Sequence, residues 1–136
     1  MASTMQVLVA TPEREVYRGE ADFLVAPGAA GELGILPKHT PLLSALTTGE
    51  LRITHGEEVD EVFVSGGYIE VQPDMITVLS DSAERAHDID EAAAKDAERK
   101  AQEMLADRKE DIDYAQAESE LAMLTARLVW LRKKKK

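Results

Sequence analysis

Apolar and polar residues alternate in short runs along the first 80 residues of the chain. The runs are rich in β-branched side chains and are separated by turn-forming pairs such as Pro27-Gly28 and Pro73-Asp74. A period of two sends successive side chains to opposite faces of a strand. Strands this short and about ten residues apart favour an antiparallel sandwich or barrel. The predicted strands are residues 5–9, 15–18, 22–26, 51–54, 61–64, 68–71 and 75–79.

The last 63 residues contain neither Gly nor Pro, and their apolar residues follow a helical period. From Asp88 onward the chain is dense in Ala, Glu, Lys, Leu, Gln and Arg, which favour helices. Asp88 with Glu91, and Asp113 with Gln116, have capping-box spacing and mark two helix starts. The charged residues 107–111 predict the bend of an antiparallel hairpin. A single extended helix of about 45 residues, roughly 68 Å long, stays open as an alternative.

Three apolar stripes are expected on these helices. The second helix carries an a/d seam with spacings of three and four, and a further stripe beside it that one partner helix cannot cover. The first helix offers mostly alanine, so a leucine-faced partner can approach closely. The seam of the second helix comprises Tyr114, Ala117, Leu121, Leu124, Leu128 and Leu131. The second stripe of this helix comprises Ala122, Ala126, Val129 and Trp130. The stripe of the first helix comprises Ala93, Ala97, Ala101, Met104 and Leu105.

Charge is distributed unevenly along the chain, which has a net charge of -10. Cationic and acidic residues number 4 and 12 in residues 1–80, 6 and 14 in residues 81–120, and 6 and 0 in residues 121–136. The acidic excess argues against nucleic-acid binding. No apolar run approaches 18 residues, and the N-terminus lacks the pattern of a signal peptide, so no membrane insertion is expected. Without cysteine, disulfides, thiolate zinc sites and cysteine nucleophiles are excluded.

The sequence offers no catalytic constellation. His39, His55 and His87 are 16 and 32 residues apart and lack the spacing of a zinc site. The glycine-rich residues 28–34 lack the Lys-Ser/Thr of a phosphate-binding loop and predict a cluster of turns. Ser65 lacks the context of a nucleophilic serine. We therefore expect a protein without an active site or a metal.

Two long motifs point to a family. Residues 31–43, GELGILPKHTPLL, resemble a signature of the epsilon subunits of F-type ATP synthases, and residues 65–71, SGGYIEV, resemble a second signature. Residues 83–85, 88–90 and 113–117 match the junction and second-helix start of that family. The resemblance covers nearly the whole chain in the same order.

The resemblance implies a fold and a set of partners. It implies an antiparallel β-sandwich of about ten strands in residues 1–87, followed by a two-helix hairpin in residues 88–136. In the family, the sandwich binds the gamma subunit and rests on the c-ring of a rotating central stalk. Within residues 31–43, Glu32 and His39 are the expected c-ring contacts. For His39, the alternative is that it only caps the turn between Pro37 and Pro41.

The family also implies a regulatory role for the helices, which can fold against the sandwich or extend into the catalytic alpha and beta subunits and obstruct ATP hydrolysis. Opposite charges would favour insertion of a cationic tip beside an acidic segment of the beta subunit. The alternative is a tail that improves solubility and complements the helix C-terminus. The residues expected to inhibit are Arg127, Trp130, Arg132, Lys133, Lys134, Lys135 and Lys136.

Some family members bind ATP in the folded hairpin through an Ile-Asp-x-x-Arg-Ala motif and further arginines. This chain keeps Ile89, Asp90 and Arg127, but Ala93 replaces the motif arginine and Lys100 replaces another. Met123 replaces a third. Loss of bidentate donors weakens binding of a triphosphate. We therefore expect weak or absent ATP binding and no cofactor.

The sequence thus predicts a non-catalytic rotor and inhibitor subunit of an ATP synthase, peripheral on the cytoplasmic face of a bacterial plasma membrane. A stromal thylakoid location is the alternative. Two other functions stay open: an acidic adaptor whose hairpin recruits a helical partner, and a small nucleotide-binding enzyme. The family motifs count against the adaptor, and the lack of a catalytic constellation counts against the enzyme.

Overall fold

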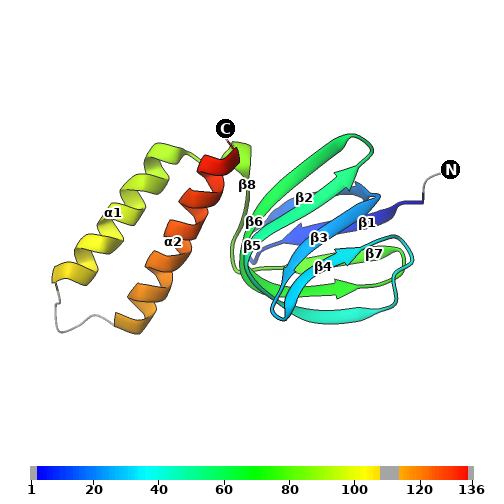
Figure 1. Ribbon diagram of the computed structural model, residues 1–136, viewed down its shortest axis with the longest axis horizontal. Coiled ribbons are helices and arrows are strands. Elements are labelled where there is room, and N and C mark those ends of the chain that lie inside the picture. The colour runs from blue at the N-terminus through cyan, green and yellow to red at the C-terminus, as the bar shows by residue number, and fades with distance from the viewer. Residues whose placement is uncertain (1–2, 108–113, 135–136) are drawn as a thin grey trace. The chain divides into compact units, whose positions relative to one another are not determined.

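The computed structural model describes residues 3–107 and 114–134 and divides into two compact units. Residues Met1–Ala86 form the first unit and residues His87–Lys136 the second. The first is built from strands and the second from helices (Figure 1). The division falls one residue before the predicted boundary. The sharp change of composition after Pro73 therefore precedes the change of architecture by two short strands, Met75–Leu79 and Ala83–Arg85.

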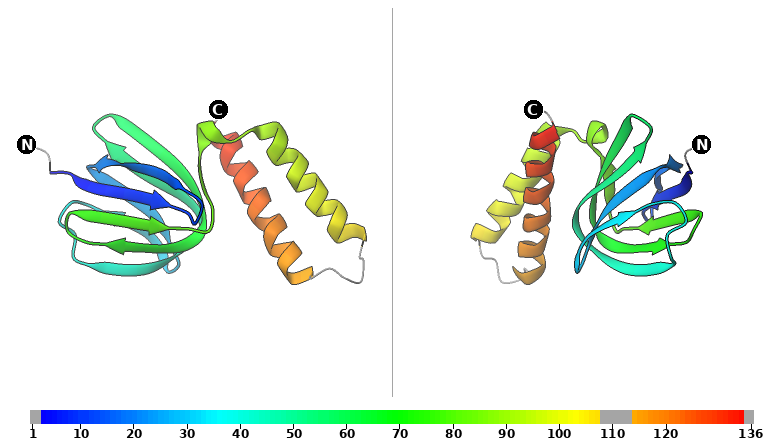
Figure 2. Two further views of the ribbon diagram at one scale, coloured as in Figure 1. Left: turned by 180° about the vertical axis from the view of Figure 1, so that it is seen from behind. Right: turned by 45° about the vertical axis from the view of Figure 1, so that its right-hand side comes forward.

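The first unit is a β-sandwich in which the described strands belong to one hydrogen-bonded sheet that curls around a core (Figures 1 and 2). Seven strands follow the order β2-β1-β7-β6-β5-β3-β4, and β8 pairs with β6. The pairs are antiparallel except β1–β7, which is parallel. The strands are β1 Met5–Ala10, β2 Glu15–Ala21, β3 Phe23–Gly28, β4 Gly31–Ile35, β5 Leu42–His55, β6 Glu58–Val71, β7 Met75–Leu79 and β8 Ala83–Arg85.

Alternation along the strands produces the core. In β1, for example, Met5, Val7 and Val9 are buried while Gln6 is exposed. Each fully buried aliphatic side chain contributes about 1.5–3 kcal/mol relative to exposure. The core comprises Met5, Val7, Val9, Val16, Ala21, Leu24, Ala26, Ile35, Leu46, Leu51, Ile53, Val62, Val64, Ile69, Val71, Ile76, Val78 and Ala83.

The described residues contain eight strands, whereas about ten were expected. The difference comes from β5 and β6, which are 14 residues long and pair with each other along their length. Gly66 and Gly67 lie within β6 at φ 96° and 111° and bend it. One half of β6 pairs with β8 and the other with β7. Dividing both long strands at this bend would give the expected ten.

The glycine-rich residues 28–34 were predicted to be a cluster of turns, and this is wrong for most of them. Gly31–Ile35 forms β4, which pairs with β3 in register from Gly28↔Gly31 to Leu24↔Ile35. Only Ala29 and Ala30 form the turn between the two strands. Glycine suits this hairpin because Gly31 has φ 136°.

The second unit is a folded hairpin of two helices, α1 Glu91–Asp107 and α2 Tyr114–Lys134, which lie side by side (Figures 1 and 2). A 3-10 turn, η1 Ala86–Asp88, precedes α1. The N-cap of α1 is Asp90 and not the predicted Asp88, because Asp90 Oδ1 accepts from the amides of Ala92 at 3.0 Å and Ala93 at 3.2 Å. Asp113, the predicted second cap, and residues 108–111 of the predicted bend lie outside the described residues.

The helix faces differ in part from the predicted stripes. On α1 the buried alanine is Ala94, at 3% exposure, while the predicted Ala93 is exposed. The Asp90 cap also starts α1 two residues later than predicted. On α2, Leu128 and Leu131 are buried and Leu121 and Leu124 half-buried. In its second stripe Trp130 is buried, whereas Ala122, Ala126 and Val129 are exposed.

Candidate functional site

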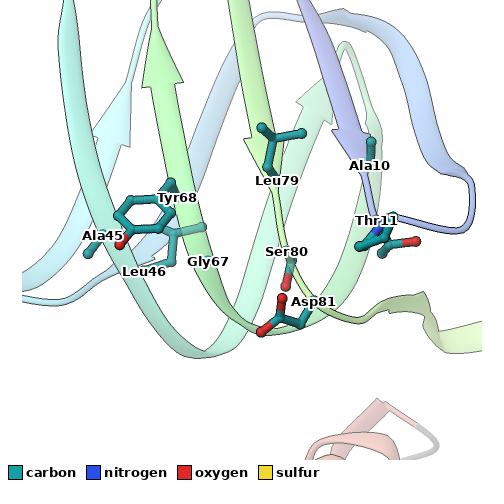
Figure 3. A pocket seen from close by; sticks show the side chains of 10 residues that line it. Ala10, Thr11, Ala45, Leu46, Gly67, Tyr68, Leu79, Ser80 and Asp81 are labelled. Atoms are coloured by element: carbon teal, nitrogen blue, oxygen red, sulfur yellow. The ribbon is translucent and has the colours of Figure 1, made fainter.

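Four apolar residues form a row across the outer face of the sandwich. Register pairs join Ala10 of β1 to Leu79 of β7, Leu79 to Tyr68 of β6, and Tyr68 to Ala45 of β5. Register partners project from the same face of a sheet, so the four side chains are neighbours (Figure 3). Tyr68 is 60% and Leu79 57% exposed. We call Ala10, Leu79, Tyr68 and Ala45 the apolar row.

The apolar row borders a hollow of about 580 Å³. Gly67 lies in its wall, where a Cβ would collide with the carbonyl oxygen of Leu79, so the hollow depends on a residue without a side chain. The buried Ser80 hydroxyl lies 2.7 Å from the Gly66 carbonyl oxygen and 2.8 Å from that of Ser82. These contacts hold the bend of β6 in place. The lining residues besides the apolar row are Thr11, Pro12, Leu46, Gly67, Ser80 and Asp81.

Residues 31–43, the longest family motif, form β4, a turn and the start of β5. Because β4 ends the strand order, Glu32 lies exposed on an edge strand. The turn is held by two backbone hydrogen bonds, from the His39 amide to Leu36 O at 3.2 Å and from the Lys38 amide to Pro73 O at 2.8 Å. Leu36 is 60% exposed and extends the apolar surface of this turn.

His39 is half-buried, and its Nδ1 lies 2.6 Å from the carbonyl oxygen of Thr40. A carbonyl only accepts, so Nδ1 carries the proton and donates. Lys38 has φ 65°, which is uncommon for a residue with a side chain. This contact holds the ring within the turn, and whether His39 also contacts a c-ring, as predicted, stays a prediction.

The residues of the nucleotide motif lie on the hairpin with other contacts. Ile89 is buried, Asp90 caps α1, and Ala93 is exposed. Lys100 Nζ lies 3.1 Å from Asp96 Oδ2. Arg127 is half-buried on α2. Of the motif residues that this chain retains, Ile89 is therefore a buried residue and Asp90 a helix cap.

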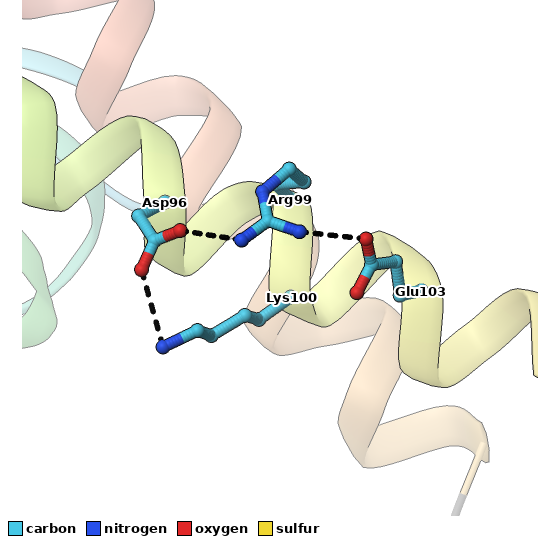
Figure 4. A network of polar contacts seen from close by, with 4 residues as sticks. All are labelled: Asp96, Arg99, Lys100 and Glu103. Atoms are coloured by element: carbon cyan, nitrogen blue, oxygen red, sulfur yellow. Dashed lines mark hydrogen bonds and ion pairs between the residues drawn. The ribbon is translucent and has the colours of Figure 1, made fainter.

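Lys100 belongs to a network on α1 (Figure 4). Asp96 also pairs with Arg99 at 2.6 Å, and Arg99 pairs with Glu103 at 2.7 Å. The hydrogen bond from Arg99, with the Lys100 ammonium, lowers the pKa of Asp96. The carboxylates in turn raise the pKa of Arg99. Ion pairs between residues three or four apart stabilise an exposed helix face.

The predicted inhibitory residues lie toward the end of α2. Arg132 and Lys133 are exposed, and Lys134 Nζ lies 5.9 Å from the centre of the Trp130 ring. This is a cation–π geometry. Lys135 and Lys136 lie outside the described residues. With Lys134 over it, the indole of Trp130 belongs to the same cationic end.

Charged clusters elsewhere on the sandwich join strands. Arg85 of β8 pairs with Asp60 of β6 at 2.5 Å and lies 5.8 Å from the centre of the Tyr17 ring. Burial raises the pKa of Tyr17, and the nearby Asp60 charge adds to the rise. A hydrogen bond from Arg18 lowers the pKa of Glu15. The Arg85 contacts tie β2, β6 and β8 together, and the Glu15–Arg18 pair lies within β2.

Within the part of the chain that the structure describes, no group of three His, Cys, Asp or Glu side chains could hold a metal. In the same residues, no helix is long and apolar enough to cross a bilayer.

The apolar row was missed in the sequence analysis. Tyr68 and Leu79 were assigned to strands, and Ala10 and Ala45 to no element, but strand alternation alone does not say that Tyr68 and Leu79 are opposite each other. Tyr68 and Leu79 occupy solvent-facing positions of the alternating pattern, since their neighbours Ile69 and Val78 are buried. Large apolar residues at solvent-facing positions of a strand were the signal that could have revealed the apolar row.

The fold and these surfaces define a two-part protein, a β-sandwich with an exposed apolar face followed by a helical hairpin. Residues 4–86 match the family model described as ATP synthase, Delta/Epsilon chain, beta-sandwich domain. Residues 87–129 match the model described as ATP synthase, Delta/Epsilon chain, long alpha-helix domain. The chain belongs to the ATP synthase delta/epsilon chain family, among its epsilon chains.

Relatives with high sequence identity support this family assignment. The chain is 54% identical over 128 residues to the ATP synthase epsilon chain of Acidithiobacillus ferridurans, covering 94% of this chain and 91% of the relative. It is 50% identical over 135 residues to that of Herminiimonas arsenicoxydans, covering 98% and 96%.

Solved structures share the fold. A chain in a Euglena gracilis mitochondrial ATP synthase structure, comprising OSCP, F1 and c-ring, superposes with a TM-score of 0.75 at 18% identity, covering 94% of this chain and 81% of that one. A chain from the central stalk and c-ring of the Tetrahymena thermophila mitochondrial enzyme gives a TM-score of 0.55 at 19% identity, with 98% of both chains covered.

Proposed function

We propose that this chain is a non-catalytic rotor subunit in the central stalk of an F-type ATP synthase, where it couples proton-driven rotation to ATP synthesis. Its partners are the gamma subunit, the c-ring and the catalytic alpha and beta subunits. The observation that carries the proposal is the apolar row on a sandwich whose relatives are named ATP synthase epsilon chain. The chain acts peripherally, on the cytoplasmic face of a bacterial plasma membrane.

The apolar row is the docking face for the gamma subunit. Tyr68 and Leu79 are large apolar side chains held in solvent by rigid strands, beside a hollow that can accept a partner's side chain. Aromatic residues in such a position often dominate the binding free energy of an interface. Contiguous exposed apolar surface on a folded domain favours a protein interface.

The turn between β4 and β5 faces the c-ring in this proposal. Leu36 supplies exposed apolar surface, Glu32 an exposed carboxylate, and His39 a ring held by Thr40. A turn fixed by hydrogen bonds to Pro73 and Leu36 loses little conformational entropy on binding.

Co-purification tests the assembly. A tagged chain expressed in its own host and solubilised with the membranes is expected to recover the gamma subunit and the whole ATPase. A preparation that contains the chain without any ATPase subunit would reject the rotor role and favour the adaptor. ATP hydrolysis by the purified chain alone would favour the enzyme.

The hairpin restrains ATP hydrolysis when it extends into the catalytic head. Support comes from the cationic end of α2, where Arg132 and Lys133 are exposed and no acidic residue follows Glu120. A cationic tip is attracted to an acidic segment of a partner. Truncation after Asp111 is expected to raise ATP hydrolysis by the assembled enzyme and leave assembly intact. Unchanged hydrolysis in the assembled truncated enzyme would refute the inhibitory role.

ATP binding by the hairpin is weak or absent. Ala93 and Met123 supply no guanidinium, and Lys100 offers a point charge already paired with Asp96. A triphosphate is held best by bidentate guanidinium groups. Titration calorimetry of ATP into the purified full chain should give no heat of binding at micromolar concentrations, and a micromolar Kd would contradict this.

A further inference from the structure

The seam between α1 and α2 is packed unevenly along its length. Near the start of α1 it is closed: Ala94 is 3%, Leu128 1% and Leu131 1% exposed. We call these three residues the basal half. Farther along α1 the helices leave a crevice of about 300 Å³. The crevice residues, which we call the distal half, are Ala97, Lys100, Ala101, Met104, Ala117, Glu120 and Leu124.

Small side chains cause the crevice. Ala97 and Ala101 of α1, and Ala117 of α2, each present only a methyl group to the seam. Met104 could fill the space, but it is 54% exposed. Atoms that line a void lose their dispersion contacts on that side. The distal half therefore holds the helices together more weakly than the basal half.

A hydrogen bond crosses the seam at the end of the distal half that is nearer to the basal half. The Thr125 hydroxyl of α2 donates to Glu98 Oε2 of α1 at 2.8 Å. Both residues lie next to members of the distal half, Ala97 on α1 and Leu124 on α2. The basal half follows within one helical turn, because Ala94 precedes Glu98 on α1 and Leu128 follows Thr125 on α2.

The first helix carries its own stabilising contacts. Lys95 pairs with Glu91 at 3.6 Å within α1. Arg99 of the same helix bridges Asp96 and Glu103 (Figure 4). These pairs at three- and four-residue spacing do not depend on α2. Its composition, rich in Ala, Glu and Lys, also favours a helix. These contacts favour a helical conformation of α1 independently of α2.

We propose that the hairpin opens in two stages: the distal half separates first, as far as the Glu98–Thr125 hydrogen bond, while the basal half stays closed. The Glu98–Thr125 hydrogen bond limits this partial opening to the distal half. The proposal goes beyond the function proposed above, since it concerns the free chain and can fail while the rotor role holds.

Amide hydrogen exchange on the full chain tests this, using Ala101→Leu to fill the crevice. The expected result is exchange slower by on the order of tenfold for α2 amides in residues 117–124, although the substitution is on α1. Amides around Leu128 and Leu131 should be unchanged. The matched control is Ala93→Leu, on an exposed position of the same helix, which should leave α2 unchanged.

Two results would overturn the proposal. Equal slowing in the basal and distal halves would mean that the hairpin opens as one unit, and no slowing on α2 would mean that each helix frays alone. Thr125→Val, which removes this hydrogen bond and keeps the side-chain shape, is the second variant. It should speed exchange several-fold for the basal amides around Leu128 and Leu131, because opening is no longer limited at the bond, and it should leave residues 117–124 nearly unchanged. This variant decides the question alone if Ala101→Leu does not fold.

Discussion

Tyr68 and Leu79 face each other across the antiparallel pair β6–β7, and each exposes more than half of its side chain, 60% and 57%. Cross-strand partners of this size normally stabilise a sheet by covering each other. Here the outer surfaces of the Tyr68 and Leu79 side chains stay in water. A binding partner that covers them would therefore gain the remaining hydrophobic free energy of their burial.

The first prediction concerns this pair. Replacing Tyr68 and Leu79 together by Ser should abolish recovery of the gamma subunit with the tagged chain, because loss of a buried aromatic anchor costs on the order of 2 kcal/mol or more. The matched control is Val59→Ser, at another exposed apolar position of β6. Urea unfolding should show both variants folded. Full recovery of gamma by the double variant would contradict the docking face.

The second prediction tests the bend that shapes the hollow. Gly67→Ala should destabilise the sandwich by about 2 kcal/mol or more, because φ is 111° and the new Cβ meets the carbonyl oxygen of Leu79. Gly34→Ala is the control, since its Cβ would lie 3.4 Å from the Phe23 ring, an ordinary contact. Urea midpoints measure both. Similar midpoints for the two variants would show that the bend can relax.

The fold was largely accessible from the sequence, because two clear periods lie in separate parts of the chain. A period of two predicted most strands, and the spacing of leucines predicted the hairpin. The errors fell where the period is ambiguous. Residues 31–35 contain two glycines, so alternation is hard to see, and β4 is specified by its pairing with β3 instead. Asp88 and Asp90 are both capping residues, and only the backbone geometry selects Asp90.

The candidate site was less accessible, because it depends on register. Ala10, Ala45, Tyr68 and Leu79 come from four strands and become neighbours only when β1, β7, β6 and β5 pair as they do. A one-residue slip would turn Tyr68 into the core. The crevice between the helices was equally hidden, since an alanine seam predicts close approach as readily as a void.

The third prediction tests the cap of α1. Asp90→Ala should destabilise the hairpin by about 1 kcal/mol, because the amides of Ala92 and Ala93 lose their acceptor. Asp90→Asn keeps an acceptor oxygen and is the matched control. Circular dichroism during thermal unfolding of the full chain would measure the loss. Equal melting of the Ala and Asn variants would show that the cap contributes nothing.

The fourth prediction concerns pH. Since Arg99 and Lys100 lower the pKa of Asp96 below its ordinary value of 3.8, the folded helix favours the ionised carboxylate. Its contribution is therefore present above pH 3.8 and is lost as the pH falls through the lower pKa of the folded state. Helix content of the wild type and Asp96→Asn should differ near neutral pH and converge at strongly acidic pH. A difference that persists in acid would exclude the ion pairs as its cause.

The fifth prediction tests how the cationic end acts. Replacing Lys133, Lys134, Lys135 and Lys136 by Gln should weaken inhibition of ATP hydrolysis in the assembled enzyme, because the tip loses its attraction to an acidic partner segment. The Debye length falls from about 10 Å at 0.1 M salt to about 3 Å at 1 M. The variant and the wild type should therefore differ most at low salt and converge at high salt.

A control that removes cationic charge elsewhere tests whether the position of the charge matters. Arg14 and Arg52 are exposed on the sandwich, away from the turn proposed to face the c-ring, and replacing both by Gln should leave inhibition unchanged at every salt concentration. Hydrolysis rates of the three assembled enzymes across a salt series provide the measurement. If the lysine variant differed from the wild type only at high salt, charge attraction would be the wrong mechanism, and the apolar surface that includes Val129, 45% exposed, would be the next segment to substitute.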